Sequence, residues 1–108
     1  MEVKVDFRKI KNWETFHEVF AEIMGFPDFY GKNNNAWIDC MSYIDDKEAG
    51  MSKIIVEPGE SLDIVVSGTE KAGKSASEVF LGFIEIVAEV NQRFIESGTQ
   101  TRLNVVAT

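Results

Sequence analysis

The sequence predicts an α/β domain, because short strand-like segments alternate along the chain with longer segments of helical spacing. Val3–Phe7 alternates apolar and polar residues with period two, as expected for a strand with one buried face. Leu62–Val66 and Leu103–Ala107 are also strand-like, being rich in aliphatic residues. Two of the intervening stretches repeat apolar residues every three or four positions, which is typical of amphipathic helices. A chain of 108 residues is expected to form one domain, over residues 1–108.

Composition restricts the classes of function. Eighteen acidic and eleven basic side chains give a formal net charge of −7, which argues against direct nucleic-acid binding. This charge fits a basic protein partner, although it also serves solubility alone. One cysteine, Cys40, and one histidine, His17, are too few for an internal disulfide or a structural zinc site. The N-terminus lacks a signal-peptide pattern, and no apolar run is long enough to span a membrane. We therefore expect a cytoplasmic protein without cofactor, metal or membrane segment.

The first predicted helix runs from Trp13 to Met24, with Asn12 as its N-cap and Gly25 as its terminator. Its buried stripe is expected at positions i, i+3, i+4 and i+7, namely Phe16, Val19, Phe20 and Ile23. His17 lies beside this stripe. We interpret it as a boundary residue rather than a catalytic one, because no acid–base partner is close in sequence.

The loop Phe26–Asn33 precedes a second helix, predicted over Asn34–Tyr43 with Asn33 as its N-cap. Proline and glycine bracket an aromatic pair in this loop, which indicates an ordered loop rather than a linker. One helix face is expected to be buried and consists of Trp37, Cys40, Met41 and Ile44, which makes Cys40 a packed thiol. The other face is expected to be exposed and consists of Asn35, Ile38, Asp39 and Ser42.

A hairpin is predicted between Ile54–Val56 and Leu62–Val66. The intervening Glu57–Glu60 has proline and then glycine at its centre, which suits a type II turn. Ile54–Val56 would then add an extra strand, although type II geometry matches strand twist less well than the primed turns do.

A long helix is predicted over Ala76–Glu96, opened by a capping box from Ser75 to Glu78 and stopped by Gly98. It carries two apolar stripes: Val79, Phe80, Phe83, Val87, Val90 and Phe94 in the first, and Leu81, Ile84, Ala88 and Ile95 in the second. A helix that is apolar on two sides is expected to be covered on two sides. We favour cover by the chain itself, including Ile54–Val56, over cover by another subunit, which would make a weak homodimer.

One stretch matches a nucleotide-binding motif. Gly68–Ser75 fits G-x-x-x-x-G-K-[ST] and lies between a predicted strand and a predicted helix. Against this reading, Glu70 places a carboxylate inside the loop, and the last strand offers no acid to help hold Mg²⁺. A sheet that houses a nucleotide also usually needs more strands than this chain can supply. Nucleotide binding therefore stays an alternative hypothesis.

The segment Phe26–Cys40 resembles the signature of the barstar family. It reads apolar–Pro–acid–aromatic–Tyr–Gly–x–Asn and continues with an Ala, a Trp, an Asp and a Cys on a helix. The first strand, the first helix and the passage from Gly98 into the last strand are similar as well. The stretch from about Asp45 to Ser77 departs from the family pattern.

This resemblance implies a two-layer α/β fold with a three-stranded parallel sheet and helices on one face. Right-handed crossovers that keep the helices on one side then give the strand order 1-2-3. The resemblance also implies an inhibitor or immunity protein rather than an enzyme. Acidic side chains would enter the active-site cleft of a small basic ribonuclease and occupy its phosphate subsites, since a carboxylate pairs with the same cations as a phosphate. A barstar-like domain that binds another protein is a further alternative.

The resemblance places the partner-binding residues on the loop, the second helix and the end of the long helix. Asp39 matches the central acid that mimics a phosphate, and Glu96 aligns with a further acid. Several neighbours depart from the family pattern: Phe29 replaces a tyrosine, Asn35 and Gln92 replace acids, and Ile38 replaces a tryptophan. The expected partner-binding residues are Phe29, Asn35, Ile38, Asp39, Ser42, Tyr43, Gln92 and Glu96. No catalytic residues are expected, because no Ser-His-Asp or Cys-His set is suggested by the spacing.

Overall fold

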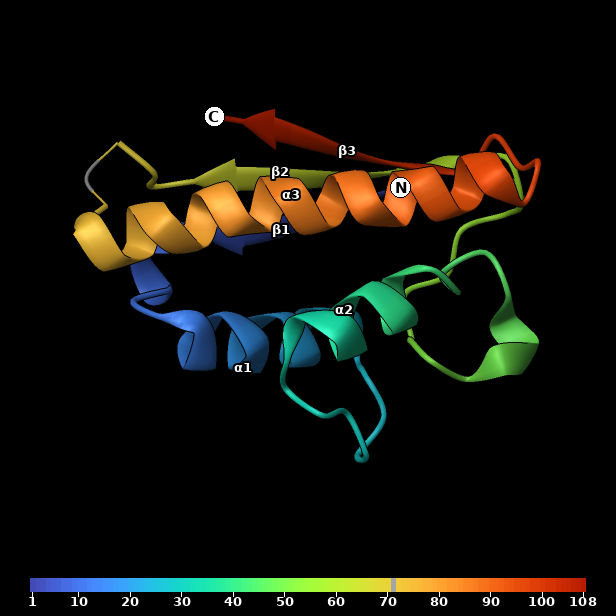
Figure 1. The fold of residues 1–108 in the computed structure, drawn as a ribbon, viewed down its shortest axis with the longest axis horizontal. Coiled ribbons are helices and arrows are strands. Elements are labelled where there is room, and N and C mark those ends of the chain that lie inside the picture. The colour runs from blue at the N-terminus through green and yellow to red at the C-terminus, as the bar shows by residue number, and fades with distance from the viewer. Residues whose placement is uncertain (71) are drawn as a thin grey trace.

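The computed structural model describes residues 1–70 and 72–108, which form a three-stranded sheet and its covering helices (Figure 1). In chain order the main elements are β1 (Glu2–Asp6), α1 (Trp13–Met24), α2 (Asn34–Met41), β2 (Ser61–Ser67), α3 (Lys74–Glu96) and β3 (Arg102–Ala107). Single 3-10 turns occupy Phe7–Lys9 and Lys47–Ala49. The strand β2 pairs with β1 on one side and β3 on the other, and both pairs are parallel. The α/β class, the parallel sheet and the order 1-2-3 are confirmed.

One face of the sheet is buried beneath the helices. Alternate residues of β2 are buried, and the register places Val3 of β1 beside Ile64 and Leu103 of β3 beside Leu62. These four side chains are at most 7% exposed, whereas Val106 on the opposite face is 41% exposed. The helix α1 contacts β1, and α3 contacts β3 and runs along the sheet (Figure 1). The helices therefore cover one face, as expected.

The helix α1 begins and ends where the sequence predicts. Asn12 Oδ1 accepts a hydrogen bond from the Thr15 amide at 2.9 Å, the Thr15 hydroxyl accepts one from the Asn12 amide, and Gly25 has a left-handed φ of 65°. The buried face was predicted wrongly at two positions, because Val19 and Ile23 are only half-buried. The buried residues are Phe16, His17, Phe20 and Met24. The rings of Phe16 and Phe20 pack against aromatic side chains of α2 and α3, which turns the buried face toward those helices.

The predicted turn forms, but the predicted hairpin does not. The Glu60 amide donates to the Glu57 carbonyl at 3.0 Å, and Gly59 between them has a φ of +90°, as a type II turn requires. Ile54–Val56 is not a strand, since the amides of its end residues donate to the carbonyl oxygens of Met24 and Ile44. The extra strand is excluded because both edges of β2 are already occupied by β1 and β3.

The helix α3 starts earlier than predicted. Its N-cap is Gly73 and has no side-chain hydrogen bond, so the capping box expected from Ser75 to Glu78 is wrong. Both residues lie inside the helix and are exposed. The predicted stop is confirmed, because Gly98 has a φ of +80° and its amide donates to the Ile95 carbonyl at 3.0 Å. In its first half, α3 lies so close to α1 that a Cβ atom on Gly82 would lie 2.4 Å from the Trp13 ring.

The two apolar stripes of α3 have different environments. The first stripe packs into the core, with Phe80 half-buried and its other members buried. The second stripe is exposed: Leu81 is 66%, Ile84 40% and Ile95 52% accessible. The expectation that the chain covers this stripe is therefore wrong. Ile54–Val56, which was expected to help, instead lies against the end of α1 and the segment after α2.

Polar side chains attach neighbouring segments to β3 and to Thr101, the residue before it. The buried Thr101 hydroxyl donates to Asp45 Oδ2 and accepts from the Gly59 amide, both at 2.8 Å. The Asn91 side chain of α3 donates to the Leu103 carbonyl and accepts from the Leu103 amide. Because β3 is an edge strand, this pair satisfies backbone groups that no neighbouring strand reaches.

Candidate partner-binding face

The loop between α1 and α2 displays one aromatic ring and buries another. The Phe29 side chain is 75% exposed, whereas Tyr30 is 8% exposed and packs on Phe26 with ring centroids 4.7 Å apart. The Tyr30 amide donates to the Pro27 carbonyl at 2.9 Å, which closes the loop. With Tyr30 fixed in the core, the loop holds Phe29 out in solvent.

His17 is a core residue, so its interpretation as a boundary residue is wrong. Its side chain is 2% exposed, stacks on Trp13 and forms a hydrogen bond through Nδ1 to the Tyr30 hydroxyl. Burial lowers the pKa of His17 and raises the pKa of Tyr30. Near neutral pH the protonated hydroxyl can therefore donate to the neutral ring. The role of His17 is structural, because this bond joins α1 to the loop that carries Phe29.

The helix α2 has its predicted cap and core face. Asn33 Oδ1 accepts from the Ala36 amide at 2.8 Å, and the four residues expected to be inside, Trp37, Cys40, Met41 and Ile44, are at most 2% exposed. Burial raises the pKa of the Cys40 thiol to about 11, so Cys40 is a packed thiol, as predicted.

Ile38 was predicted to lie on the exposed face, and this is wrong, since its side chain is 7% exposed and belongs to the core. The Trp37 ring contacts aromatic rings of both α1 and α3, so α2 is covered from more than one side. The buried arc is therefore wider than one stripe. Periodicity in so short a helix does not reveal which flanking position is covered.

The other expected residues of α2 and its C-terminal turn remain at or near the surface. The Asp39 side chain is 55% exposed, Asn35 is exposed, and Tyr43 is 46% exposed. Ser42 is half-buried, and its hydroxyl donates to the Ile38 carbonyl at 2.6 Å. The predicted exposure of Asp39 is thus confirmed.

The end of α3 lies beside this surface. Gln92 and Glu96 are exposed, and the Gln92 amide donates to a Glu96 carboxylate oxygen at 3.3 Å. The helices α2 and α3 contact each other, so the structure brings the two sets of expected residues to one side of the molecule. We use the name recognition face for the expected partner-binding residues that are not buried, together with Arg93, namely Phe29, Asn35, Asp39, Ser42, Tyr43, Gln92, Arg93 and Glu96.

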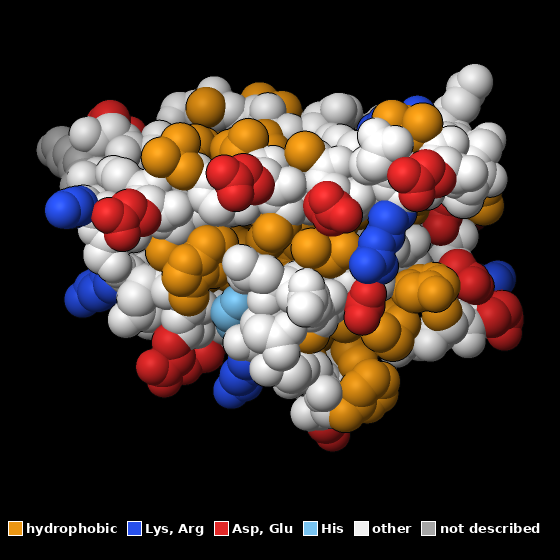
Figure 2. All heavy atoms as spheres, in the orientation of Figure 1, with side chains coloured by type: hydrophobic (Ala, Val, Ile, Leu, Met, Phe, Trp, Pro, Cys, Tyr) orange, Lys and Arg blue, Asp and Glu red, His pale blue; other side chains and the backbone are white. Residues whose placement is uncertain are grey.

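Arg93 belongs to this face although the sequence analysis did not single it out. Its Nη1 atom lies 2.8 Å from Asp39 Oδ1, and the two side chains are 45% and 55% exposed. In Figure 2 a basic and an acidic side chain touch between α3 and α2, and hydrophobic side chains gather on both sides of them. In the sequence, Arg93 comes directly before Phe94 and so borders the buried stripe of α3. This position is the one signal that its side chain could reach a neighbouring helix.

The first glycine of the nucleotide-motif stretch has a structural reason that does not involve a ligand. Gly68 has a φ of +74°, and a Cβ atom there would lie 2.6 Å from the Arg8 side chain. Gly73 is the N-cap of α3. Lys71, within the motif, lies outside the described residues. The described part of the stretch lines a cavity of about 380 Å³ with residues of the segment after β1.

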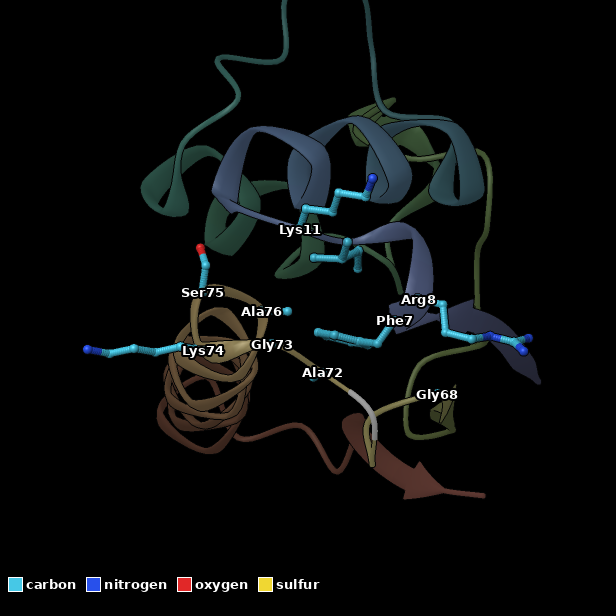
Figure 3. Close-up of a pocket in the computed structure, with 10 residues that line it drawn as sticks. Phe7, Arg8, Lys11, Gly68, Ala72, Gly73, Lys74, Ser75 and Ala76 are labelled. Atoms are coloured by element: carbon cyan, nitrogen blue, oxygen red, sulfur yellow. The ribbon is translucent and has the colours of Figure 1, made fainter.

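Among the described residues, the side chains around this cavity do not form a phosphate site. In Figure 3 Lys74 and Ser75 leave the start of α3 in different directions, and Arg8 points away on the far side. Asp6, at the end of neighbouring β1, could have helped to hold Mg²⁺, but it is paired with Arg8 at 2.9 Å. The geometry therefore does not support the alternative of a nucleotide-binding module.

The same part of the chain lacks the features of a metal site and of a membrane-spanning helix. Residues 1–70 and 72–108 contain no group of three or more side chains placed to hold a metal ion. Within these ranges, no helix has both the length and the apolar composition needed to cross a membrane.

The fold and the recognition face define a small α/β protein that exposes a loop, a short helix and the end of a long helix together. A family model described as Barstar (barnase inhibitor) matches residues 1–106, and the chain therefore belongs to the barstar family. Proteins of this family are inhibitors rather than enzymes. Comparison with curated proteins gives no significant match. The resemblance carried by Phe26–Cys40 is thus confirmed over nearly the whole chain.

Proposed function

We propose that this protein is a cytoplasmic, non-enzymatic inhibitor or immunity protein that blocks the active site of a small basic ribonuclease. The observation that carries the proposal is the exposed Asp39 carboxylate on α2, in a chain of the barstar family. A ribonuclease cleft must bind RNA phosphates, so it presents cations with which a carboxylate can pair. The inhibitor acts by occupying those subsites and needs no cofactor or metal.

The recognition face supplies different interactions at different points. Asp39 is the phosphate-like acid, and Glu96 is a second acid at the edge of the face. Phe29 and Tyr43 offer exposed aromatic surface of the kind that anchors protein interfaces. Asn35, Ser42 and Gln92 supply neutral polar groups around the acids. The net charge of −7 speeds the encounter with a basic enzyme and disfavours direct binding of nucleic acid.

A second candidate is a barstar-family domain that binds a protein other than a ribonuclease. The observation in its favour is that Asn35 and Gln92 are neutral where the family resemblance implies acids. These neutral positions lower the charge that the face offers to a polycationic cleft.

The experiment measures inhibition of ribonuclease activity by the wild-type protein and by Asp39→Ala. The enzymes are barnase, which the family description names, and any ribonuclease retained from a native lysate and eluted with salt. Asp39→Ala should abolish or strongly weaken inhibition, because it leaves enzyme cations buried without a partner. Its folding stability should change by no more than about 0.5 kcal/mol, since the residue is exposed.

Asp63→Ala is the matched control, because it removes an acid from β2 on the uncovered face of the sheet. It should inhibit as wild type does. Equal inhibition by Asp39→Ala and wild type would show that this protein does not act through the recognition face.

A further inference from the structure

The carboxylate at the centre of the recognition face already has a cation bound to it. Arg93 of α3 donates to Asp39 of α2 at 2.8 Å, across 54 residues of sequence. The described residues hold one other ion pair of this kind, Arg8 with Asp6, whose members are two residues apart at the end of β1. The Asp39–Arg93 pair is thus tertiary and lies where the partner is proposed to bind.

This pair changes the charge that the face presents. Arg93 compensates Asp39, and Asn35 and Gln92 are neutral, so Glu96 is the uncompensated charge among these residues. The protein is strongly acidic as a whole, but the centre of its recognition face is a side-by-side acid and base. A cleft lined with cations alone would meet a like charge at this point.

The pair is exposed enough to be rearranged on binding. Exposed ion pairs contribute little to folding stability, because water competes for both partners. When a partner covers the face, water leaves, and an unmatched charge becomes costly. Arg93 uses one nitrogen on Asp39, whereas a guanidinium carries five N–H donors in a planar fork that matches a carboxylate. Burial of Arg93 therefore favours a partner that brings an acid to it.

We propose that Arg93 determines specificity: the pair selects a partner whose site offers a cation to Asp39 and a carboxylate to Arg93, and it disfavours a purely cationic cleft. This inference rests on the proposed function, because it names the chemistry of the partner at the same face. Specificity of this kind comes from a repulsive element as well as from attractive contacts.

The first test compares inhibition of barnase by wild type, Arg93→Gln, Arg93→Lys and Arg8→Gln. Arg93→Gln should inhibit at least about tenfold more strongly than wild type, since it frees Asp39 and removes a like charge from the interface. Arg93→Lys keeps the charge and should stay close to wild type. Arg8→Gln is the matched control, because it breaks the other exposed Arg–Asp pair with the same change in net charge. It should leave inhibition unchanged.

A double variant separates the local effect from a general one. The gain from Arg93→Gln should shrink when Asp39→Ala is also present, because the gain acts in part through the freed carboxylate. The melting temperatures of Arg93→Gln and Arg8→Gln should be similar to each other. A difference in inhibition between these two variants then cannot come from a difference in folding stability.

The second test uses barnase variants in which single cleft lysines or arginines are replaced by glutamate. At least one of these should be inhibited more strongly by wild type than by Arg93→Gln, because the new acid can receive Arg93. The inference is overturned if no such variant exists, or if Arg93→Gln inhibits barnase no better than wild type. It is also overturned if neither wild type nor Arg93→Gln inhibits barnase, since Arg93 would then not be the reason why wild type fails to bind this enzyme.

Inhibition by wild type that depends on Asp39 but not on Arg93 would overturn this inference and leave the proposed function standing.

Discussion

The imidazole of His17 and the hydroxyl of Tyr30 form a buried hydrogen bond that joins α1 to the loop preceding α2. Both side chains are almost fully buried, and the next residue along the loop from Tyr30 toward α1 is the exposed Phe29. The position of the loop therefore depends on a residue of α1 that is itself almost fully buried.

The burial of His17 predicts a pH dependence of folding stability. Burial holds the pKa of His17 below its ordinary value of 6.5, so the unfolded chain binds a proton at a higher pH than the folded chain does. The stability contributed by neutral His17 is fully present above pH 6.5 and is lost as the pH falls from there through the folded pKa. Urea unfolding at pH 7.5 and pH 5.5 should show this loss, and His17→Gln should show less of it. An equal loss of stability in wild type and His17→Gln would show that His17 is not the group responsible.

Gly82→Ala is expected to destabilise the protein although alanine is the better helix former. A Cβ atom at this position would overlap the Trp13 ring, and overpacking of a core typically costs about 1 to 3 kcal/mol. Thermal or urea unfolding measures the change. Gly73→Ala is the control, because a Cβ atom there meets nothing within 4 Å, and its effect should be small. A Gly82→Ala variant as stable as wild type would show that Trp13 does not pack against α3 in this way.

Asn35→Asp is expected to raise the association rate with barnase and to steepen the salt dependence of that rate. The side chain is exposed on α2, one turn before Asp39, so the new charge adds to the long-range attraction of a basic enzyme. Stopped-flow mixing at several ionic strengths measures both effects. Unchanged rates at low salt would indicate that the enzyme does not approach this side of α2.

Millimolar ATP or GTP with Mg²⁺ is expected to leave the melting temperature unchanged. Ligand at about 100 times its dissociation constant would stabilise the fold by about 2.7 kcal/mol, which is easily detected in a domain of this size. The divergent Lys74 and Ser75 side chains and the Asp6–Arg8 pair give no reason to expect such binding. A reproducible upward shift that disappears in Lys74→Ala would revive the nucleotide hypothesis.

The exposed second stripe of α3 keeps the prediction of a weak homodimer open to test. Leu81, Ile84 and Ile95 are between 40% and 66% accessible, and burial of such side chains against a second copy would remove apolar surface from water. Sedimentation at micromolar concentrations should detect the dimer, and Leu81→Lys should weaken it. A strict monomer would mean that the stripe does not bind a second copy of this chain.

Local sequence determined where most elements begin and end. Asn12 and Asn33 cap helices because an Asn side chain reaches an amide three residues ahead, and this needs no other part of the chain. Gly25 and Gly98 end helices because glycine adopts a left-handed φ at low cost. The turn at Gly59 follows the same logic. The family resemblance predicted the parallel sheet and its strand order, because local periodicity does not indicate which strands pair.

Tertiary structure decided the features that depend on which elements become neighbours. Ile54–Val56 has the composition of a strand, but β2 has no free edge, so its amides bond elsewhere. Ile38 is buried because α2 is covered from more than one side. The apolar pattern of an eight-residue helix does not determine how much of its circumference is buried. The Asp39–Arg93 pair joins residues 54 positions apart, and it exists because α2 and α3 pack together. The sequence alone thus determined that Asp39 is exposed, whereas only packing decided which charge stands beside it.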